Sequence, residues 1–213
     1  VEVIHEVLKA IRGSIRPETN IHLLGFAKAD KIHEFTGYGI TSFDSTSPLI
    51  AAFKDEKKNY YIEKSGGGIE YYAAIRIPQS IENTRLVRGT KEGRFNAESL
   101  QKMEAHALSA IRAFHETGKN IETTLEAICE YQHFLTIGNG KTAEAEAKTL
   151  VKQQQQMRRT LEAQPWKECG CDICRDAGVE VIIFRASNRN KRRGMHNLGI
   201  YHRHLHKTLK DAE

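Results

Sequence analysis

The string Cys-Gly-Cys-Asp-Ile-Cys at residues 169–174 places three cysteines within six residues, and a histidine follows in Gly-Met-His-Asn-Leu at residues 194–198. Two tight spacings bring the three sulfurs onto one turn of the chain. Three thiolates and an imidazole are ligands that Zn²⁺ prefers, and a closed set of this kind is typical of a structural site. We therefore predict a structural Zn²⁺ held by Cys169, Cys171, Cys174 and His196.

The sequence contains other cysteines and histidines that are possible ligands. His202, His204 and His206 are rival fourth ligands, but they fall in a basic segment expected to form an exposed helix. The fourth cysteine, Cys129, lies in an apolar helical pattern and is expected in the core. Because three of only four cysteines are clustered, a disulfide framework is disfavoured, and metal ligation in a reducing, cytoplasmic compartment is favoured.

The net charge of +5 is unevenly distributed along the 213 residues. Residues 151–213 hold 13 Lys and Arg against 7 Asp and Glu, whereas the preceding residues hold 19 against 20. A local positive field attracts a polyanion such as nucleic acid. A solvated basic face is the alternative. The residues expected to contact phosphates are Arg185, Arg189, Lys191, Arg192 and Arg193. No run of about 18 apolar residues occurs, so no membrane partner is expected.

The N-terminal residues alternate between helical and strand patterns. Apolar spacing over residues 2–12 predicts an amphipathic helix, and short apolar runs at 21–26 and 40–43 predict strands. A short helix is expected between the two strands, at residues 31–36. This order predicts parallel strands joined by crossover helices.

The middle of the chain changes character twice. Runs rich in Tyr and Ile at residues 59–63 and 69–77 flank a Ser-Gly-Gly-Gly turn and predict a β-hairpin. A long helical stretch follows, with helices expected at 97–116, 121–136 and 142–163, and a glycine-rich turn at 138–140 between the last two. Beyond it we expect the cysteine cluster, a strand-like run at 179–184, a basic loop at 185–193 and a last helix after His196.

The ligand pattern resembles the zinc subdomain of tRNA-guanine transglycosylases. The family pattern Cys-x-Cys-x-x-Cys and His-Asn-Leu-x-x-Tyr is matched by the three cysteines, His196, Asn197, Leu198 and Tyr201. The gap between Cys174 and His196 is a few residues shorter than in the bacterial queuine-pathway enzymes. The intervening loop therefore differs, while the ligand set is intact.

A second match lies far upstream. His-Leu-Leu-Gly-Phe at 22–26 and Gly-Ile-Thr-Ser-Phe-Asp-Ser-Thr-Ser-Pro at 39–48 are similar to the seventh and eighth barrel strands of that family. The resemblance implies that Asp44, in Phe-Asp at the end of the last strand, is the nucleophile. The residues at 45–47 differ from the family pattern. Such folds place catalysis where barrel strands end, and a carboxylate there can attack an anomeric carbon to form a covalent ester.

The resemblance implies a fold and a set of domains. The fold class is α/β, the C-terminal portion of a (β/α)8 TIM barrel with a helical insertion and a Cys3His zinc-binding subdomain. Residues 1–53 would supply the last βα units of the barrel, and 54–96 a β-hairpin or connector. Residues 97–163 would form the helical insertion, and 164–213 the zinc-binding subdomain with a basic C-terminal helix.

The resemblance also implies a reaction, the exchange of guanine for a 7-deazaguanine base in DNA or tRNA. The nucleophile displaces guanine from C1′, the incoming base attacks the covalent intermediate, and a second aspartate moves the proton. The target base must leave its stack to be reached. The usual tRNA enzymes have no long helical insertion between nucleophile and zinc site, so the branch that modifies DNA is favoured.

The base-recognition residues and the second aspartate belong to earlier barrel strands that this sequence does not contain. We therefore expect a fragment, or one subunit of a split enzyme whose partner chain carries the N-terminal barrel half. A second copy of the chain is another expected partner, because zinc subdomains in this family help subunits pair. The alternative is a non-catalytic zinc-containing module that binds nucleic acid.

Overall fold

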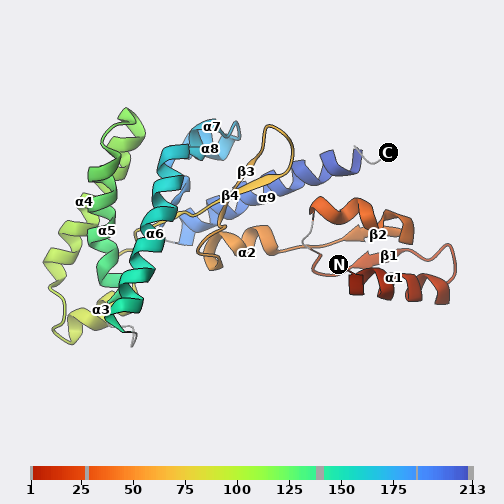
Figure 1. Ribbon diagram of the computed structural model, residues 1–213, viewed down its shortest axis with the longest axis horizontal. Coiled ribbons are helices and arrows are strands. Elements are labelled where there is room, and N and C mark those ends of the chain that lie inside the picture. Colours follow the sequence, from red (N-terminus) through yellow and green to blue (C-terminus); the bar gives the residue numbers. More distant parts are fainter. Residues whose placement is uncertain (1, 27–28, 138–141, 186, 211–213) are drawn as a thin grey trace.

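The computed structural model describes residues 2–26, 29–137, 142–185 and 187–210. An N-terminal unit and a bundle of long helices lie at opposite ends, and a long C-terminal helix extends between them (Figure 1). The α-helices are α1 Glu2–Ser14, α2 Ser47–Lys54, α3 Thr84–Lys91, α4 Ala97–Thr117, α5 Ile121–Thr136, α6 Ala143–Ala163, α7 Pro165–Glu168, α8 Asp172–Ala177 and α9 Ser187–Lys210. No helix in these ranges combines the length and the apolar character needed to cross a membrane.

The strands form three separate two-stranded sheets. They are β1 Ile21–Leu23, β2 Ile40–Phe43, β3 Tyr60–Glu63, β4 Ile69–Tyr72, β5 Ile75–Arg76 and β6 Ile183–Phe184. The pairs β1–β2 and β5–β6 are parallel, and β3–β4 is the predicted antiparallel hairpin. The structure is thus mixed α/β and mostly helical, and its described residues form no closed barrel.

The N-terminal unit follows the predicted helix–strand–helix–strand order. Strand β2 has the predicted bounds, whereas β1 stops at Leu23, before Gly25 with its φ of 66°. The connecting helix is a 3-10 helix, η1 Ala29–Tyr38. Leu8 of α1 packs with Phe26, Ile32 and Phe35 in a small core of this unit.

The three predicted long helices are confirmed as α4, α5 and α6. Asn96 caps α4 by accepting a hydrogen bond from the Ser99 amide, and Thr142 caps α6 in the same way through the Ala145 amide. Gly118, in the left-handed conformation with φ 65°, ends α4. The turn predicted at 138–140 lies outside the described residues.

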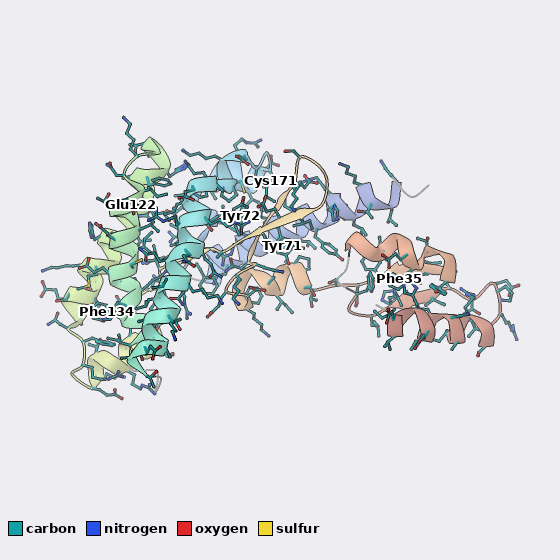
Figure 2. The ribbon with its side chains drawn as sticks, viewed as in Figure 1. Phe35, Tyr71, Tyr72, Glu122, Phe134 and Cys171 are labelled. Carbon is teal, nitrogen blue, oxygen red and sulfur yellow. The ribbon has the colours of Figure 1, made fainter. Side chains whose placement is uncertain are left out.

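The helical bundle, the hairpin and the metal-ligand segment share one hydrophobic core. Ile111 and Ile128 of the bundle, Ile75 of β5 and Trp166 of α7 are members of this cluster and are almost fully buried. Figure 2 shows Phe134 in the bundle and Phe35 far away in the N-terminal unit, in the second, smaller cluster. Helix α9 packs against elements of both parts.

The C-terminal segment differs from the prediction in two places. Helix α9 is continuous from Ser187, so the basic loop expected at 185–193 is wrong over most of its length. Lys and Arg are good helix formers, and no proline ends the helix there. Within the strand-like run at 179–184, only Ile183–Phe184 is a strand, and Gly178–Val181 form a 3-10 turn, η2. In a short, buried apolar run, the periodicity of the sequence cannot distinguish a strand from a helical turn.

Candidate metal centre and catalytic carboxylate

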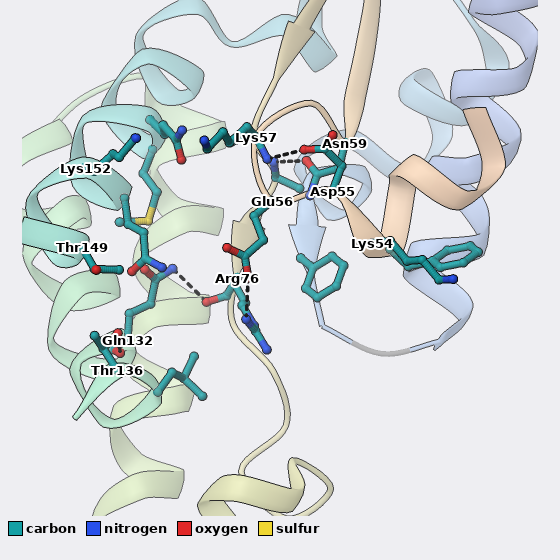
Figure 3. Close-up of a pocket in the computed structure, with 18 residues that line it drawn as sticks. Lys54, Asp55, Glu56, Lys57, Asn59, Arg76, Gln132, Thr136, Thr149 and Lys152 are labelled. Carbon is teal, nitrogen blue, oxygen red and sulfur yellow. Dashed lines mark hydrogen bonds and ion pairs between the residues drawn. The ribbon is translucent and has the colours of Figure 1, made fainter. Parts of the chain in front are cut away.

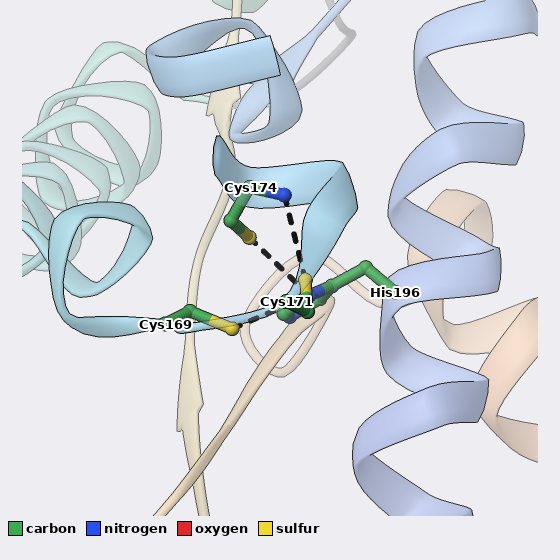
Figure 4. A group of neighbouring side chains, drawn as sticks. All are labelled: Cys169, Cys171, Cys174 and His196. Carbon is green, nitrogen blue, oxygen red and sulfur yellow. Dashed lines mark hydrogen bonds between the residues drawn. The ribbon is translucent and has the colours of Figure 1, made fainter. Parts of the chain in front are cut away.

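The four predicted metal ligands converge on one point (Figure 4). The Nδ1 atom of His196 lies 3.9 Å from the Sγ of Cys169, 3.3 Å from that of Cys171 and 3.4 Å from that of Cys174. All four ligand atoms lie within 4.8 Å of one another. A tetrahedral zinc ion with Zn–S of about 2.3 Å and Zn–N of about 2.0 Å separates its S and N ligands by about 3.5 Å. The observed separations therefore fit one ion bound by all four side chains.

Two short turns and one long helix place these ligands. Cys169 follows α7 directly, and Cys171 caps the N-terminus of α8, where its sulfur accepts a hydrogen bond from the Cys174 amide. His196 comes from the middle of α9 and is 2% exposed. Since α8 begins at the second cysteine, one helical turn brings the third cysteine back beside it.

Strand β3 forms the second wall of the metal centre. The Nε2–H of His196 donates to the Tyr61 carbonyl over 2.7 Å, an arrangement that directs Nδ1 toward the sulfurs. The ring of Tyr60 stacks on the imidazole, with centroids 4.3 Å apart. The Tyr60 hydroxyl lies 3.1 Å from the Cys174 sulfur. The ligands are thus oriented by buried neighbours as well as by the chain turns.

The three thiols have different pKa values because they face one another. A hydrogen bond from Cys174, assisted by His196, lowers the pKa of Cys169 to about 3. Burial raises the pKa of Cys171, but hydrogen bonds from His196 and the Cys174 amide outweigh it, so the net change is downward. The bond to Cys169 raises the pKa of Cys174. Two of the three thiols, Cys169 and Cys171, are therefore shifted toward thiolate, the form that binds metal.

The rival histidines lie elsewhere on α9. His202 and His206 are exposed, and their Nε2 atoms are 2.9 Å apart, one helical turn from each other. Among the described residues, the group of three or more potential ligands that converges is the predicted one. Cys129 is half-buried beside the main core, and burial raises the pKa of its thiol.

The predicted nucleophile, Asp44, lies where β1 and β2 end side by side. It directly follows β2, its amide donates to the Leu23 carbonyl over 3.2 Å, and its side chain is exposed. Its Oδ1 accepts a hydrogen bond of 2.5 Å from the amide of Gly25. Gly25 itself has the left-handed φ of 66°. The carboxylate is thus held at the carboxyl edge of a parallel strand pair.

Asn197, the residue after the histidine ligand, ties the metal centre to the segment that follows Asp44. Its side-chain oxygen accepts from the Tyr61 amide, and its side-chain nitrogen donates to the carbonyls of Pro48 and Asn59. Pro48 lies in the first turn of α2, four residues after Asp44. Helices α2 and α9 approach closely at Gly194. A Cβ atom added at this glycine would lie only 3.4 Å from the Leu49 carbonyl oxygen. Helix α9 therefore connects the two sites.

Arg193 makes a second set of buried hydrogen bonds to α2. Its guanidinium is fully buried and donates to the carbonyls of Ala52, Val181 and Ile183, and to the side chain of Asn190. Burial lowers its pKa to about 9, so the group stays charged at neutral pH. Its cation is offset by carbonyl oxygens. The predicted phosphate contact therefore does not fit Arg193.

The other members of the basic string divide into two groups. Arg185 forms a largely buried ion pair with Glu104, and Arg189 pairs with Glu180 over 2.7 Å. Lys191 and Arg192 are exposed in the first turns of α9. A phosphate contact by the first two would compete with existing pairs, whereas Lys191 and Arg192 face solvent.

Several residues that shape the site have no specific signature in the sequence. The pattern predicts Tyr60 and Tyr61 only as hairpin residues, and it includes Gly25 only as part of a matched motif. For the tyrosines the signal was weak, since an aromatic pair on a strand is usual for a core. Gly25 could have been identified from its position, because a glycine that directly follows a predicted strand often adopts a left-handed conformation.

These features define the class of protein. A Cys3His metal centre, with a strand-end aspartate upstream, is the combination that the resemblance to guanine transglycosylases implies. Comparison with curated proteins finds DNA-guanine transglycosylase of Salmonella montevideo, 36% identical over 204 residues. The chain is thus similar to a protein of the DNA-guanine branch, and the predicted resemblance is confirmed.

The extent of this match is unequal for the two proteins. It covers 96% of the present chain but 46% of the Salmonella protein, so the chain spans about half the length of that relative. No profile of a known protein family matches the chain.

Proposed function

We propose that this chain forms part of a guanine transglycosylase that replaces guanine in DNA by a 7-deazaguanine base, with Asp44 as the nucleophile. The observation that carries the proposal is the placement of Asp44. It is an exposed carboxylate at the carboxyl edge of parallel strands, held by a backbone amide, in a chain 36% identical to a DNA-guanine transglycosylase.

The reaction needs two displacements at one carbon. A carboxylate oxygen of Asp44 forms a bond to C1′ of the target nucleotide, while the C1′–N9 bond breaks and guanine leaves with that electron pair and gains a proton. N9 of the incoming 7-deazaguanine then bonds to C1′, loses its proton, and returns Asp44 to its carboxylate form. The hydrogen bond from the Gly25 amide orients the nucleophile in both steps.

The metal centre serves the scaffold in this proposal. The Cys3His donor set and its separations suit Zn²⁺, and no side chain of the set is left for a substrate. Bound zinc would fix α8 against α9, and Asn197 and Arg193 then hold α2 against α9. These residues position the segment that carries Asp44 without contacting the substrate.

The active site needs further residues, which we propose come from another segment or a partner chain with the remaining barrel strands. Two surfaces support this. Val3, Val7 and Ile11 form an exposed apolar stripe on α1, with 69%, 50% and 39% of each residue exposed. Among the described strands, β1 pairs with β2 alone, so its other edge is open to another strand. The second aspartate would arrive with that segment.

The proposed substrate is DNA rather than tRNA, because the relative is named for DNA and because α4–α6 form the insertion that favoured that branch. Lys191 and Arg192 supply exposed charge for a phosphate backbone, a contact that sets position rather than sequence. Free thiols at the metal centre suit a reducing compartment, and we place the protein in the cytoplasm on that ground.

Trapping the covalent intermediate tests the proposal. Incubating the active enzyme with target DNA and no incoming base should leave the chain bound to a depurinated nucleotide, visible as a shifted band under denaturing conditions. Asp44→Asn should abolish this band, because an amide is a far weaker nucleophile than a carboxylate.

Asp176→Asn is the matched control, since Asp176 is exposed on α8 and pairs only loosely with Arg175 over 3.8 Å. It should give the adduct at the normal yield. An adduct at normal yield from Asp44→Asn would refute the assignment of the nucleophile.

A further inference from the structure

We propose that a basic groove between the hairpin region and helix α6 binds the phosphate backbone of duplex DNA. This proposal rests on the proposed function in one respect, that the substrate is DNA. The groove consists of two adjoining depressions that share Lys57, Ala73 and Gln156. One wall is the segment from the end of α2 through β4, and the other is α6 of the helical insertion.

Lysines approach the groove from both walls. Figure 3 shows Lys57 on the connector and Lys152 on α6 on opposite sides of the first depression. Lys58 and Lys64 line the second depression, and Lys58 also lies 5.3 Å from the centroid of the Tyr71 ring. All four lysines are exposed, and none has an acidic partner within ion-pair distance among the described residues.

The acidic groups of the groove are already engaged. Asp55 accepts hydrogen bonds from the amides of Lys57 and Lys58, at 2.7 and 2.8 Å. Glu56 pairs with Arg76, and Glu70 pairs with Arg159 over 2.7 Å. Because Glu56 and Glu70 are paired with arginines, the four lysine ammonium groups outweigh the remaining carboxylate of Asp55 and leave a net positive groove.

The remaining lining suits a backbone rather than a base edge. Gln153, Gln156 and Thr149 of α6 offer neutral hydrogen-bonding groups beside the lysines. The glycine turn after Lys64 leaves open space around Gly67 and Gly68, so a phosphate can approach the main chain there. Charges spread over two adjoining depressions suit a repeating polyanion better than one small anion. This gives the helical insertion a role, because α6 supplies one wall.

Salt-dependent binding of duplex DNA tests the groove. Wild type and Lys57→Ala/Lys152→Ala, as full chains loaded with zinc, would be titrated against a fluorescent 30-base-pair duplex between about 50 and 200 mM NaCl. Each lost phosphate contact lowers the slope of log K against log salt by about 0.9. The double variant should therefore lose about 2 units of slope and bind about tenfold more weakly at low salt.

Lys91→Ala/Lys119→Ala is the matched control, since both lysines are exposed and lie outside the groove while the charge lost is the same. It should stay within about twofold of wild type. Equal affinities and slopes for wild type and the groove variant, or a loss seen with tRNA but not with duplex DNA, would overturn the proposal. The assay requires no base exchange, so its result stands apart from that of the Asp44 experiment.

Discussion

The metal centre and the Asp44 strand end differ in how completely this chain builds them. Around the metal ligands, Tyr60, Tyr61 and His196 are buried and satisfied by groups of the chain itself. Asp44 instead lies exposed at the end of a two-stranded sheet. A two-stranded sheet is marginal alone. The difference teaches that this chain completes the metal centre with its own groups, whereas it leaves the proposed catalytic edge at Asp44 open to solvent.

The two regions are nevertheless joined by buried polar contacts. Asn197 and Arg193, which flank His196 on α9, bind the carbonyls of Pro48 and Ala52 on α2. The two contacts span 149 and 141 positions of sequence, and they satisfy buried groups that would otherwise lack partners. Damage at the metal centre should therefore reach Asp44, whereas damage at Asp44 should leave the metal centre intact.

Removing a metal ligand should have the largest effect. We expect His196→Ala to lose the metal that wild type retains at close to one zinc per chain, and to lose cooperative unfolding of the C-terminal half. Structural zinc sites contribute binding free energy on the order of 10 kcal/mol, which becomes folding free energy. Metal analysis after dialysis, together with thermal unfolding, measures both.

His202→Ala is the control for that experiment, because His202 is exposed on the same helix and lies outside the ligand group. It should keep its zinc and its unfolding midpoint. If His202→Ala loses zinc and His196→Ala does not, the fourth ligand is misassigned.

Two neighbouring arginines give the next largest effect. Arg193→Met should destabilise the fold by about 3–5 kcal/mol, because it leaves the carbonyls of Ala52, Val181 and Ile183 without their donor. Arg192→Met removes the same chemistry from an exposed position and should change stability by less than about 0.5 kcal/mol. Urea unfolding of wild type and both variants measures the two losses of unfolding free energy. Equal stabilities of the two variants would contradict a stabilising role for the buried hydrogen bonds of Arg193.

Local sequence patterns predicted the metal ligands and the main helices, whereas the role of individual arginines depends on their burial in the folded chain. The ligand group followed from cysteine spacing, and β2 and α4–α6 from periodicity and glycine signals. Arg192 and Arg193 are identical in type and adjacent, so composition placed both in one phosphate-binding group. Burial at Arg193, His196, Asn197 and Ile200 follows helical spacing. Extending α9 upstream from His196 would have placed Arg193 on its buried face.

The strand pair could be predicted but its completion could not. The sequence marks β1 and β2 by their apolar runs, and no described strand pairs with the other edge of β1. Likewise, the hydrogen bond from Gly25 to Asp44 joins residues 19 apart, and no local pattern specifies it. Long-range contacts of this kind decide the site, while short-range patterns decide its elements.

Gly25→Ala should give the smallest effect and the sharpest view of the catalytic edge. At a φ of 66°, an alanine costs roughly 1–2 kcal/mol, although no atom lies within 4 Å of the added Cβ. Relief of that strain would turn the amide away from Asp44, so adduct yield should fall while zinc content stays unchanged. Gly37→Ala, in open space and without a positive φ, controls for the added methyl group. If Gly25→Ala gives normal adduct yield, the Gly25 amide does not orient the nucleophile, and the parallel strand ends alone would hold Asp44 in place.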